Sequence, residues 1–423
     1  MLDLRLIRAE PDLIRNAVRK RGMELDVDRI LELDERHRDA LYHMEQRRAT
    51  LNATSKQISE LKKSGQDAQE KIQAMRGLRE EIKGLEETIR ATSQQLNALL
   101  LEVPNLPREE VPVGLTEEEN LVVREGGEVR KPDFEVLPHW EIGRRLGILA
   151  FESAVRIAGE RFVSNMGPGA ALERALVNFM LDVHTTEHGY LEVWPPYLAR
   201  ADALIGTANL PKFEDVLFKT TAGHYLIPTA EVPLTNMHMG EILEAQDLPK
   251  HYTAYTACFR NEQVGAGKEA RGLIRLYQFH KVELMKFTTP ETADQELEAL
   301  VSDAETIVQR LGLPYRVSLL CTGDITFASC KTYDIEVYFP GMDCWLELSS
   351  CSMYDTFQAR RCNTRYRPEP KAKPEFVHTM NGSGLATGRT LAALLEHYQQ
   401  ADGTISVPEV LRPYMRGMSV IGA

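Results

Sequence analysis

Two arginines on otherwise apolar segments are the strongest chemical signal in this sequence. Arg260 follows the run Tyr255-Thr-Ala-Cys-Phe259, and Arg389 ends the run Gly384-Leu-Ala-Thr-Gly-Arg389. Burying a guanidinium group is costly unless an anion meets it. Two such groups from segments far apart in the chain therefore indicate a site that is built around a polyphosphate.

Between the two arginines lies a segment that is rich in hard oxygen ligands. The run Trp345-Leu-Glu-Leu-Ser-Ser350 combines a carboxylate with hydroxyl groups. Such oxygens suit the metal ion that a bound polyphosphate carries. The sequence has neither a P-loop motif nor a Gly-x-Gly-x-x-Gly after a strand, so we expect neither a P-loop nor a dinucleotide-binding fold.

The composition is that of a globular protein with more than one domain. The chain has 423 residues, of which 43% are hydrophobic and 26% charged. Its net charge of −12 excludes binding to nucleic acid through bulk charge, so RNA binding would need a local basic surface. We expect no membrane segment, because no run of about 18 apolar residues occurs and the start does not resemble a secretion signal. The six cysteines include no Cys-x-x-Cys pair, which favours reduced thiols in the cytoplasm.

Residues 28–103 predict an antiparallel coiled-coil hairpin. Apolar residues recur there at alternating three- and four-residue spacing, which is a heptad seam. The segment Lys62-Lys-Ser-Gly-Gln-Asp67 predicts the turn, and Asp67 is a candidate cap for the second helix. The first seam comprises Ile30, Leu33, His37, Ala40, Met44, Leu51, Ile58 and Leu61; the second comprises Met75, Leu78, Ile82, Leu85, Ile89, Thr92, Leu96, Leu99 and Val103.

The periodicity alone favours an oligomerisation coil or spacer over a binding arm. Basic residues gather on the first helix and the tip, but a solvated helix face explains them equally well. They become informative only beside a catalytic core that acts on RNA. These basic residues are Arg36, Arg38, Arg47, Arg48, Lys56, Lys62 and Lys63.

The second half of the chain predicts an antiparallel sheet flanked by helices. Strand-like runs follow one another without strict alternation with helices, which argues against a parallel βαβ fold. We expect three regions: residues 1–104 with the hairpin, a linker at 105–120 and a catalytic domain at 121–423. The predicted strands are 252–259, 274–287, 333–339 and 344–350, and the predicted helices are 170–187, 292–311 and 389–399.

From end to end, the chain resembles the bacterial seryl-tRNA synthetases, which are class II aminoacyl-tRNA synthetases. Each motif is weak alone, but their order and spacing together are specific. The motifs that carry the resemblance are Gly206-Thr-Ala-Asn-Leu-Pro-Lys-Phe-Glu214, Pro228-Thr-Ala-Glu-Val232, Phe259-Arg-Asn-Glu262, Arg271-Gly-Leu-Ile-Arg275, Gln278-Phe-His-Lys-Val-Glu283, Ser349-Ser-Cys-Ser352, Phe357-Gln-Ala-Arg-Arg361, Asn381-Gly-Ser-Gly-Leu-Ala-Thr-Gly-Arg389 and Val407-Pro-Glu-Val-Leu-Arg-Pro-Tyr414.

The resemblance implies an α+β fold, with a coiled-coil arm before a class II catalytic domain. It implies that ATP and Mg²⁺ activate L-serine to seryl-adenylate, and that the seryl group then passes to the 3′ end of tRNA(Ser) or tRNA(Sec). It also implies that the arm binds the tRNA without reading the anticodon. The family is homodimeric and cytoplasmic, and one subunit's arm serves the other's active site.

The resemblance also assigns roles to individual residues. Arg260 and Arg389 are the catalytic residues that meet the phosphates, Glu262 accepts from the adenine amino group, and Phe279 stacks on the adenine. The implied ATP contacts are Arg260, Asn261, Glu262, Phe279, Glu347, Leu348, Ser349, Ser350 and Arg389, with Glu347 and Ser350 as the Mg²⁺ ligands. The implied L-serine contacts are Thr229, Ala230, Glu231, Arg260, Glu283, Asn381 and Ser383.

Some positions depart from the family pattern. Gln263, Val264 and Lys268 replace small residues and an arginine in the loop that approaches the acceptor end of the tRNA, which leaves the efficiency of charging open. Tyr354 stands where phenylalanine is usual, and His280 stands where aspartate or asparagine is frequent. These departures are typical of a divergent branch or a second copy.

Two other functions remain as alternatives. An adenylating enzyme that passes serine to a carrier would not need an arm that reaches a tRNA. A synthetase-like RNA-binding scaffold would have no reason to keep Arg260, Glu262, Glu283, Glu347 and Arg389 together.

Overall fold

The structure is a computed structural model that describes residues 1–130, 132–262 and 271–422. The chain forms two compact units, Leu2–Pro104 and Asn105–Ala423, the second of which also includes Met1. Across the described residues, no helix combines the length and the apolar content that crossing a membrane requires.

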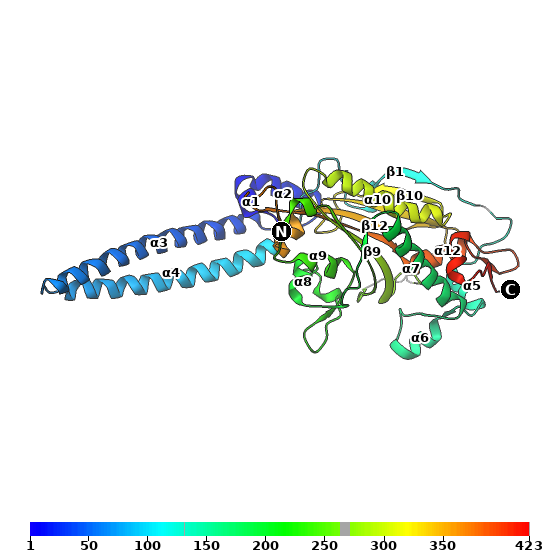
Figure 1. The fold of residues 1–423 in the computed structure, drawn as a ribbon, viewed down its shortest axis with the longest axis horizontal. Helices are drawn as coiled ribbons and strands as arrows, with labels where there is room; N and C mark the ends of the chain where they lie inside the picture. Colours follow the sequence, from blue (N-terminus) through cyan, green and yellow to red (C-terminus); the bar gives the residue numbers. More distant parts are fainter. Residues whose placement is uncertain (131, 263–270, 423) are drawn as a thin grey trace. The chain divides into compact units, whose positions relative to one another are not determined.

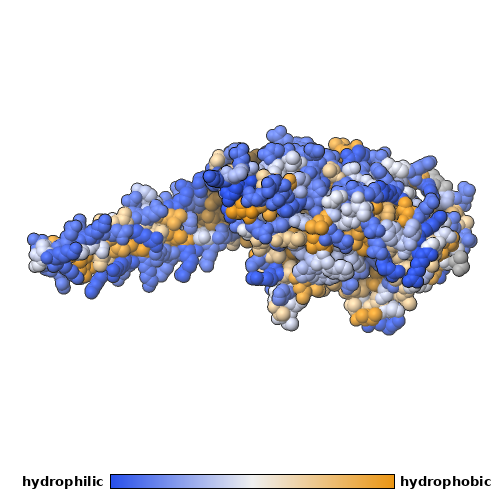
Figure 2. Space-filling model, viewed as in Figure 1, coloured by the Kyte–Doolittle hydropathy of each residue, from blue (hydrophilic) through white to orange (hydrophobic). Residues whose placement is uncertain are grey.

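The first unit is entirely helical and contains the predicted hairpin. Its helices are α1 (Leu4–Ala9), α2 (Pro11–Lys20), α3 (Val27–Lys63) and α4 (Gln69–Leu101). Helices α3 and α4 lie side by side along their whole length (Figure 1). Every residue of both predicted seams is buried or half-buried. On the visible face, apolar side chains lie mainly between the two helices, and hydrophilic ones surround them (Figure 2).

The two polar positions of the seam pair with each other. The Nδ1 atom of His37 lies 3.0 Å from the Oγ1 atom of Thr92, across the hairpin. The turn is also close to the prediction: the Asp67 carboxylate accepts from the backbone N–H of Gln69 at 2.9 Å, although Ala68 is the residue that directly precedes the helix. A polar pair inside an apolar seam favours one register, because any slip would bury both groups without a partner.

The second unit is built on an eight-stranded sheet in the order β1-β10-β11-β12-β15-β9-β8-β4. Neighbouring strands are antiparallel except for the edge pair β4 and β8, which is parallel. The predicted fold class is therefore confirmed. The strands are β1 (Leu121–Gly126), β4 (Leu191–Glu192), β8 (Lys250–Phe259), β9 (Gln278–Thr288), β10 (Tyr315–Leu319), β11 (Lys331–Phe339), β12 (Cys344–Asp355) and β15 (His378–Ala386).

Three amphipathic helices cover one face of this sheet (Figure 1). In α7 (Pro168–Thr186), a proline occupies the first turn, and Leu172, Leu176, Met180 and Val183 form the buried stripe. The other two helices are α10 (Ala293–Arg310) and α12 (Thr387–His397), which begins directly after β15. These three helices do not cover the opposite face of the central strands, where a site can form.

Shorter elements complete the second unit. Residues 105–120, the predicted linker, contain no long element, and the backbone N–H groups of Asn105 and Arg108 donate to Phe327 and Cys330. The short helices are α5 (His139–Arg145), α6 (Phe151–Ala158), α8 (Ala201–Gly206), α9 (Glu231–Thr235) and α11 (Phe357–Cys362), and the short strands are β2 (Leu149–Ala150), β3 (Ser164–Asn165), β5 (Leu198–Ala199), β6 (Tyr225–Leu226), β7 (Ile242–Glu244), β13 (Arg365–Arg367), β14 (Glu375–Phe376), β16 (Ile405–Ser406) and β17 (Val420–Ile421).

Candidate active site

One cavity of about 330 Å³ brings the two arginines together. Arg260, directly after β8, and Arg389, in the first turn of α12, both line it. The cavity lies on the face of the sheet opposite α7, α10 and α12, because side chains alternate along β9: His280 bonds to α7, whereas Phe279 and Lys281 line the cavity. Other predicted site residues that line it are Thr229, Glu231, Glu262, Glu347, Ser350, Asn381 and Ser383.

Main-chain carbonyl groups orient both guanidinium groups. The Nε–H of Arg260 donates to the carbonyl of Pro228 at 3.2 Å, and its guanidinium carbon lies 5.2 Å from the centre of the Phe279 ring. Arg389 donates from Nε to Ile274 at 3.2 Å and from NH1 to the Glu347 carbonyl at 2.6 Å. The carbonyl fixes the direction of Arg260 without neutralising its charge. Arg389 also pairs with the Glu347 carboxylate, which lies 3.3 Å from its NH1 atom, and it still has donors left for an anion.

A β-bulge places Glu347 and Ser350 on the same side of β12. In a regular strand, residues three apart face opposite sides of the sheet. The register between β11 and β12 shifts between Glu347 and Ser349, and Leu348 has no partner on β11. This extra residue reverses the alternation, so the carboxylate and the hydroxyl both reach the cavity.

The same bulge turns two other predicted ATP contacts away from the cavity. Leu348 is packed in the apolar core, and the hydroxyl of Ser349 donates to the carbonyl of Ser383 at 2.6 Å. Neither side chain lines the cavity. A contact between ATP and Leu348 or Ser349 would therefore have to use their backbone atoms, and it stays a prediction.

Sequence reasoning missed Asp334, which lies directly opposite Ser350 on β11. Its Oδ1 atom is buried and has no hydrogen-bond partner among the described residues. Burial raises the pKa of Asp334 well above its ordinary value, and the nearby Glu347 carboxylate raises it further. Two carboxylates that repel each other, together with the neighbouring Ser350 hydroxyl, form a donor set that a hard divalent cation would satisfy.

At the amino-acid end, Glu283 lies behind the cavity wall. Its carboxylate is fully buried and accepts from Thr229 Oγ1 at 2.8 Å and from Asn381 Nδ2 at 2.7 Å. The Lys281 ammonium lies 2.5 Å from the same carboxylate. A substrate would have to displace one of these partners to touch Glu283. In this structure its visible effect is to orient Thr229 and Asn381, which do line the cavity.

Lys281 is a second residue that sequence reasoning missed. It is 6% exposed, lines the cavity and stands between Phe279 and Glu283 on the same face of β9. The sequence did contain a signal for it. Phe279 and Glu283 were both assigned to the site, and side chains two apart on a strand share a face, so Lys281 should face the site as well.

Glu231 carries the most clearly perturbed carboxyl group of the cavity. Burial raises its pKa to about 7, and repulsion from Glu283 adds to the effect. The Nε2 of Gln358 donates to Glu231 at 2.6 Å, and Gln358 in turn accepts from Thr379 at 2.8 Å. The carboxyl group is thus held in place while it changes charge near neutral pH.

Replacing Glu231 by glutamine should change how stability depends on pH. Glu231 binds its proton more tightly in the folded chain, where its pKa is about 7, than in the unfolded chain, where its pKa is 4.5. Proton binding therefore stabilises the folded chain at low pH, and this contribution is lost as the pH rises through about 7. Glu231→Gln cannot ionise and keeps an acceptor for Gln358. The difference between the free energy of unfolding of the variant and that of the unmodified chain should therefore shift by about 2 kcal/mol in favour of the variant from pH 5 to pH 8. Urea unfolding at the two pH values measures this change, and an equal difference at both would contradict the raised pKa.

The remaining predicted residues lie at the edges of the cavity. Glu262 lines it, and its backbone carbonyl accepts from Arg161 at 3.1 Å. Asn261 does not line it; its backbone N–H donates to Val216 at 2.9 Å. Ala230 is fully buried at the start of α9. The loop residues Gln263, Val264 and Lys268 lie outside the described residues.

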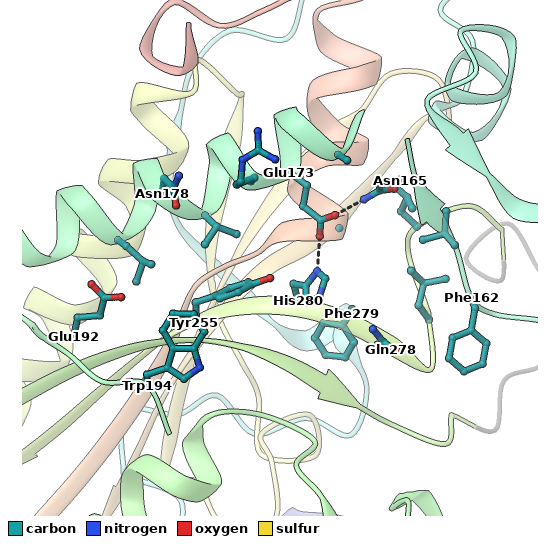
Figure 3. Close-up of a pocket in the computed structure, with 18 of the residues that line it drawn as sticks. Phe162, Asn165, Glu173, Asn178, Glu192, Trp194, Tyr255, Gln278, Phe279 and His280 are labelled. Atoms are coloured by element: carbon teal, nitrogen blue, oxygen red, sulfur yellow. Dashed lines mark hydrogen bonds and ion pairs between the residues drawn. The ribbon is translucent and has the colours of Figure 1, made fainter. Parts of the chain in front are cut away.

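A second cavity of about 600 Å³ is bordered by α7 and by Gln278, Phe279 and His280 of β9, so Phe279 borders both cavities. Figure 3 shows Glu173 between His280 and Asn165, with Tyr255 and Trp194 on the opposite wall. Glu173 accepts from His280 Nδ1 at 2.9 Å and from the hydroxyl of Thr387 at 2.9 Å. Since Thr387 is the first residue of α12, this contact helps to fix the helix turn that carries Arg389.

Family models match both parts of the chain. Residues 1–107 match the seryl-tRNA synthetase N-terminal domain, and residues 217–398 match the class II tRNA synthetase core domain of the G, H, P, S and T enzymes.

Whole proteins match over nearly the full length. The chain is 52% identical to the serine–tRNA ligase of Carboxydothermus hydrogenoformans, over 98% of each chain. It is 53% identical to that of Thermomicrobium roseum, over 100% of this chain and 95% of the relative. The crystal structure of seryl-tRNA synthetase from Pyrococcus horikoshii complexed with ATP superposes with a TM-score of 0.94 at 35% identity, covering 100% of this chain and 99% of the other. The chain therefore belongs to the seryl-tRNA synthetase family.

Proposed function

We propose that this chain is a serine–tRNA ligase, which activates L-serine with ATP and transfers the seryl group to tRNA(Ser). The observation that carries the proposal is the single cavity lined by Arg260, Arg389, Glu347 and Glu231. Identity of 52–53% to serine–tRNA ligases over nearly the whole chain supports the same activity.

The reaction consists of two group transfers. A carboxylate oxygen of serine forms a bond to the α-phosphorus of ATP, while the bond from that phosphorus to the bridging oxygen breaks and pyrophosphate leaves. A hydroxyl of the terminal ribose of the tRNA then attacks the seryl carbonyl, and AMP leaves. Neither step needs a nucleophile from the protein, so the chain contributes position and charge.

We assign the phosphate end of the cavity to ATP. Arg260 would meet the α-phosphate and the serine carboxylate, and Arg389 would meet the γ-phosphate. Phe279 would stack on the adenine, and Glu262 would accept from its amino group. The implied Mg²⁺ would be held by Glu347 and Ser350, and the unpaired Asp334 oxygen fits such an ion. Bound Mg²⁺ would neutralise phosphate charge as pyrophosphate departs.

We assign the other end of the cavity to serine. Thr229, Glu231 and Ser383 offer hydrogen-bonding groups at the wall, and Glu283 holds Thr229 and Asn381 in position. A wall that pairs with a hydroxyl rejects alanine strongly, because its own polar groups would be left without partners. Threonine would be rejected by lack of room, which is worth about 1–3 kcal/mol per methyl group.

One assay tests the proposal against both alternatives. Serine-dependent exchange of pyrophosphate into ATP reports the first step, and attachment of labelled serine to total tRNA reports the second. Exchange followed by charging is expected. Exchange without charging of any tRNA would favour transfer to another acceptor, and the absence of exchange would favour a scaffold. Charging of tRNA(Sec) transcript tests the wider substrate range.

The two units would have different functions. We assign residues 1–104 to tRNA binding through the hairpin and residues 121–423 to catalysis, with 105–120 as the connection. The cytoplasmic location suggested by the cysteines stays a prediction.

We further propose that two copies of the chain associate through the face beside β4. This edge strand pairs only with β8 among the described strands. Leu191 is 63% exposed and Trp194 80% exposed, and Trp194 also borders the second cavity (Figure 3). Large apolar side chains exposed together at a strand edge are typical of an interface.

Replacing Trp194 by glutamate should separate the two copies. A charge at this position would have to be buried without a partner in the dimer. Sedimentation should change from the mass of two chains to that of one, 47.8 kDa. Tyr42→Glu is the matched control, because Tyr42 is an exposed aromatic residue of the hairpin. A dimer of Trp194→Glu as tight as that of the unmodified chain would exclude this face.

A further inference from the structure

The imidazole of His139, on α5, lies behind the wall of the candidate active-site cavity and has no role in the steps above. Its side chain is fully buried, and both of its ring nitrogens have partners. Nδ1 lies 2.8 Å from the Oε1 atom of Glu396, whose side chain is also fully buried. Nε2 lies 3.0 Å from the backbone nitrogen of Leu273, a residue that lines the cavity. The ring thus connects a residue of α12 to the cavity wall.

The two partners of His139 decide where its ring hydrogen lies. A backbone N–H can only donate, so Nε2 must accept from Leu273 and carry the lone pair. An ionised carboxylate can only accept, so Nδ1 must carry the hydrogen and donate to Glu396. Glu396 is held in turn by the backbone N–H groups of His139 at 3.0 Å and Gly341 at 2.8 Å. These partners fix the neutral imidazole in one tautomer and one direction.

Arg389 holds the same segment of the wall as His139. The Nε–H of Arg389 donates to the carbonyl of Ile274 at 3.2 Å, one residue after the N–H that His139 accepts. Arg389 and Glu396 both belong to α12 and are about two helical turns apart, so they lie on the same side of the helix. Helix α12 therefore holds two successive residues of the wall, Ile274 through Arg389 and Leu273 through Glu396 and His139.

The backbone before Leu273 is adapted to this close contact. Gly272 has a φ of +67°, a conformation that residues with a side chain rarely adopt. A methyl group at Gly272 would lie 2.1 Å from the Nε2 atom of His139. No side chain therefore fits between the imidazole and this segment.

The segment that His139 holds lies at the end of the cavity assigned to ATP. Residues 273–276 all line the cavity. The NH1 atom of Arg275 lies 3.9 Å from the Oε2 atom of Glu262, which is assigned to the adenine amino group. The carbonyl of Ile274 orients Arg389, which is assigned to the γ-phosphate. A shift of this segment would therefore move groups that meet the nucleotide, whereas the residues assigned to serine lie on other elements.

We propose that His139 is a positioning residue for ATP, whose imidazole, oriented by Glu396, accepts from the Leu273 N–H and holds residues 273–276 in the conformation that binds the nucleotide. The proposal rests on the proposed function, because it uses the assignment of this end of the cavity to ATP. Without the acceptor, the buried N–H of Leu273 would have no partner, and the segment would shift to regain one. ATP would then bind more weakly.

Two substitutions at this position separate the functions of the two ring nitrogens. His139→Gln can bring its Oε1 atom near the place of Nε2 and accept from Leu273, but it gives up the bond to the Glu396 side chain. His139→Asn can keep the bond to Glu396, but its amide is too short to reach Leu273. The dissociation constant for ATP should rise about tenfold in His139→Asn and less than about threefold in His139→Gln. Calorimetric titration with ATP and Mg²⁺, without serine, measures both.

Kinetics and stability together exclude a merely structural effect. In pyrophosphate exchange, His139→Asn should raise the KM for ATP about tenfold and leave the KM for serine within about twofold. Each variant loses one buried hydrogen bond, so urea unfolding should show similar losses of stability for the two. If His139→Asn bound ATP as tightly as His139→Gln, the inference would be overturned.

A second pair of variants leaves His139 in place. Gly272→Ala would push the imidazole away from Leu273 and should weaken ATP binding about as much as His139→Asn. Gly147→Ala is the matched control, because Gly147 has a φ of +68° but, among the described residues, no atom beyond its chain neighbours lies within 4 Å of the added methyl group. It should leave ATP binding unchanged. Equal affinity of the two alanine variants for ATP would overturn the inference even if neither His139 variant folds.

The outcomes also separate this inference from the proposed function. If the unmodified chain binds ATP but does not exchange pyrophosphate with serine, the proposed function fails, and the variants still test the role of His139 in ATP binding. If exchange occurs and His139→Asn keeps its affinity for ATP, only the inference about His139 is overturned. If the unmodified chain binds no ATP, both are wrong.

Discussion

Replacing Arg389 by lysine is expected to lower the rate of serine-dependent pyrophosphate exchange by about 10³-fold. Arg389 uses two of its nitrogens to bond to Ile274 and Glu347. The planar guanidinium can keep these bonds and still present donors to a phosphate, whereas an ammonium group cannot span all three. The loss should be mainly in kcat, because the charge on the departing pyrophosphate grows in the transition state. Steady-state exchange with ATP and serine varied separately measures it.

A matched substitution elsewhere shows whether the effect belongs to the site. Arg310 also carries a guanidinium in a paired geometry, with Glu187, but on α10 and outside the cavity. Arg310→Lys should change exchange by less than about twofold, since exposed pairs contribute about 0–1 kcal/mol. If Arg389→Lys were as active as Arg310→Lys, the assignment of Arg389 to the phosphates would be wrong.

The periodic parts of this fold were predictable because each depends on a simple spacing. The seam of the hairpin repeats every three or four residues, and all seventeen seam positions are buried or half-buried. The predicted strand at 252–259 became β8, at Lys250–Phe259. The strand predicted from residue 274 begins instead at Gln278, and the carbonyl of Ile274 accepts from Arg389.

The sequence named many of the residues that line the cavity, but it did not reveal which side chains of each run face it. A motif places Glu347, Leu348, Ser349 and Ser350 in the same short run, yet only a bulge decides which of the four side chains reach the cavity. A bulge depends on the pairing with β11, which no local pattern reveals. Asp334 was missed for the same reason, because its place opposite Ser350 is a property of the register.

Replacing residues 35–95 by a short turn is expected to abolish tRNA charging and to leave serine-dependent exchange within about twofold. The hairpin packs on its own seam and belongs to the unit Leu2–Pro104, so its removal takes no residue from the sheet or from the cavity. Binding to tRNA, in contrast, needs a basic surface on an acidic chain. The two assays run on the same preparation measure both effects.

The charges of the hairpin allow a sharper version of this experiment. Arg38, Arg47 and Arg48 pair with acidic residues of the same unit. Lys56, Lys62 and Lys63 are exposed and form no ion pair within the described residues, so no acidic side chain competes with phosphates for them.

Replacing Lys56, Lys62 and Lys63 together by alanine should weaken tRNA binding about tenfold or more, reduce its dependence on salt concentration, and leave exchange unchanged. The paired arginines provide the control: Arg47→Ala with Arg48→Ala should have a smaller effect on binding. Charging at the normal rate after loss of the hairpin would show that the arm does not bind the tRNA. The hairpin would then be a spacer or an oligomerisation element, which is the interpretation that its periodicity alone favours.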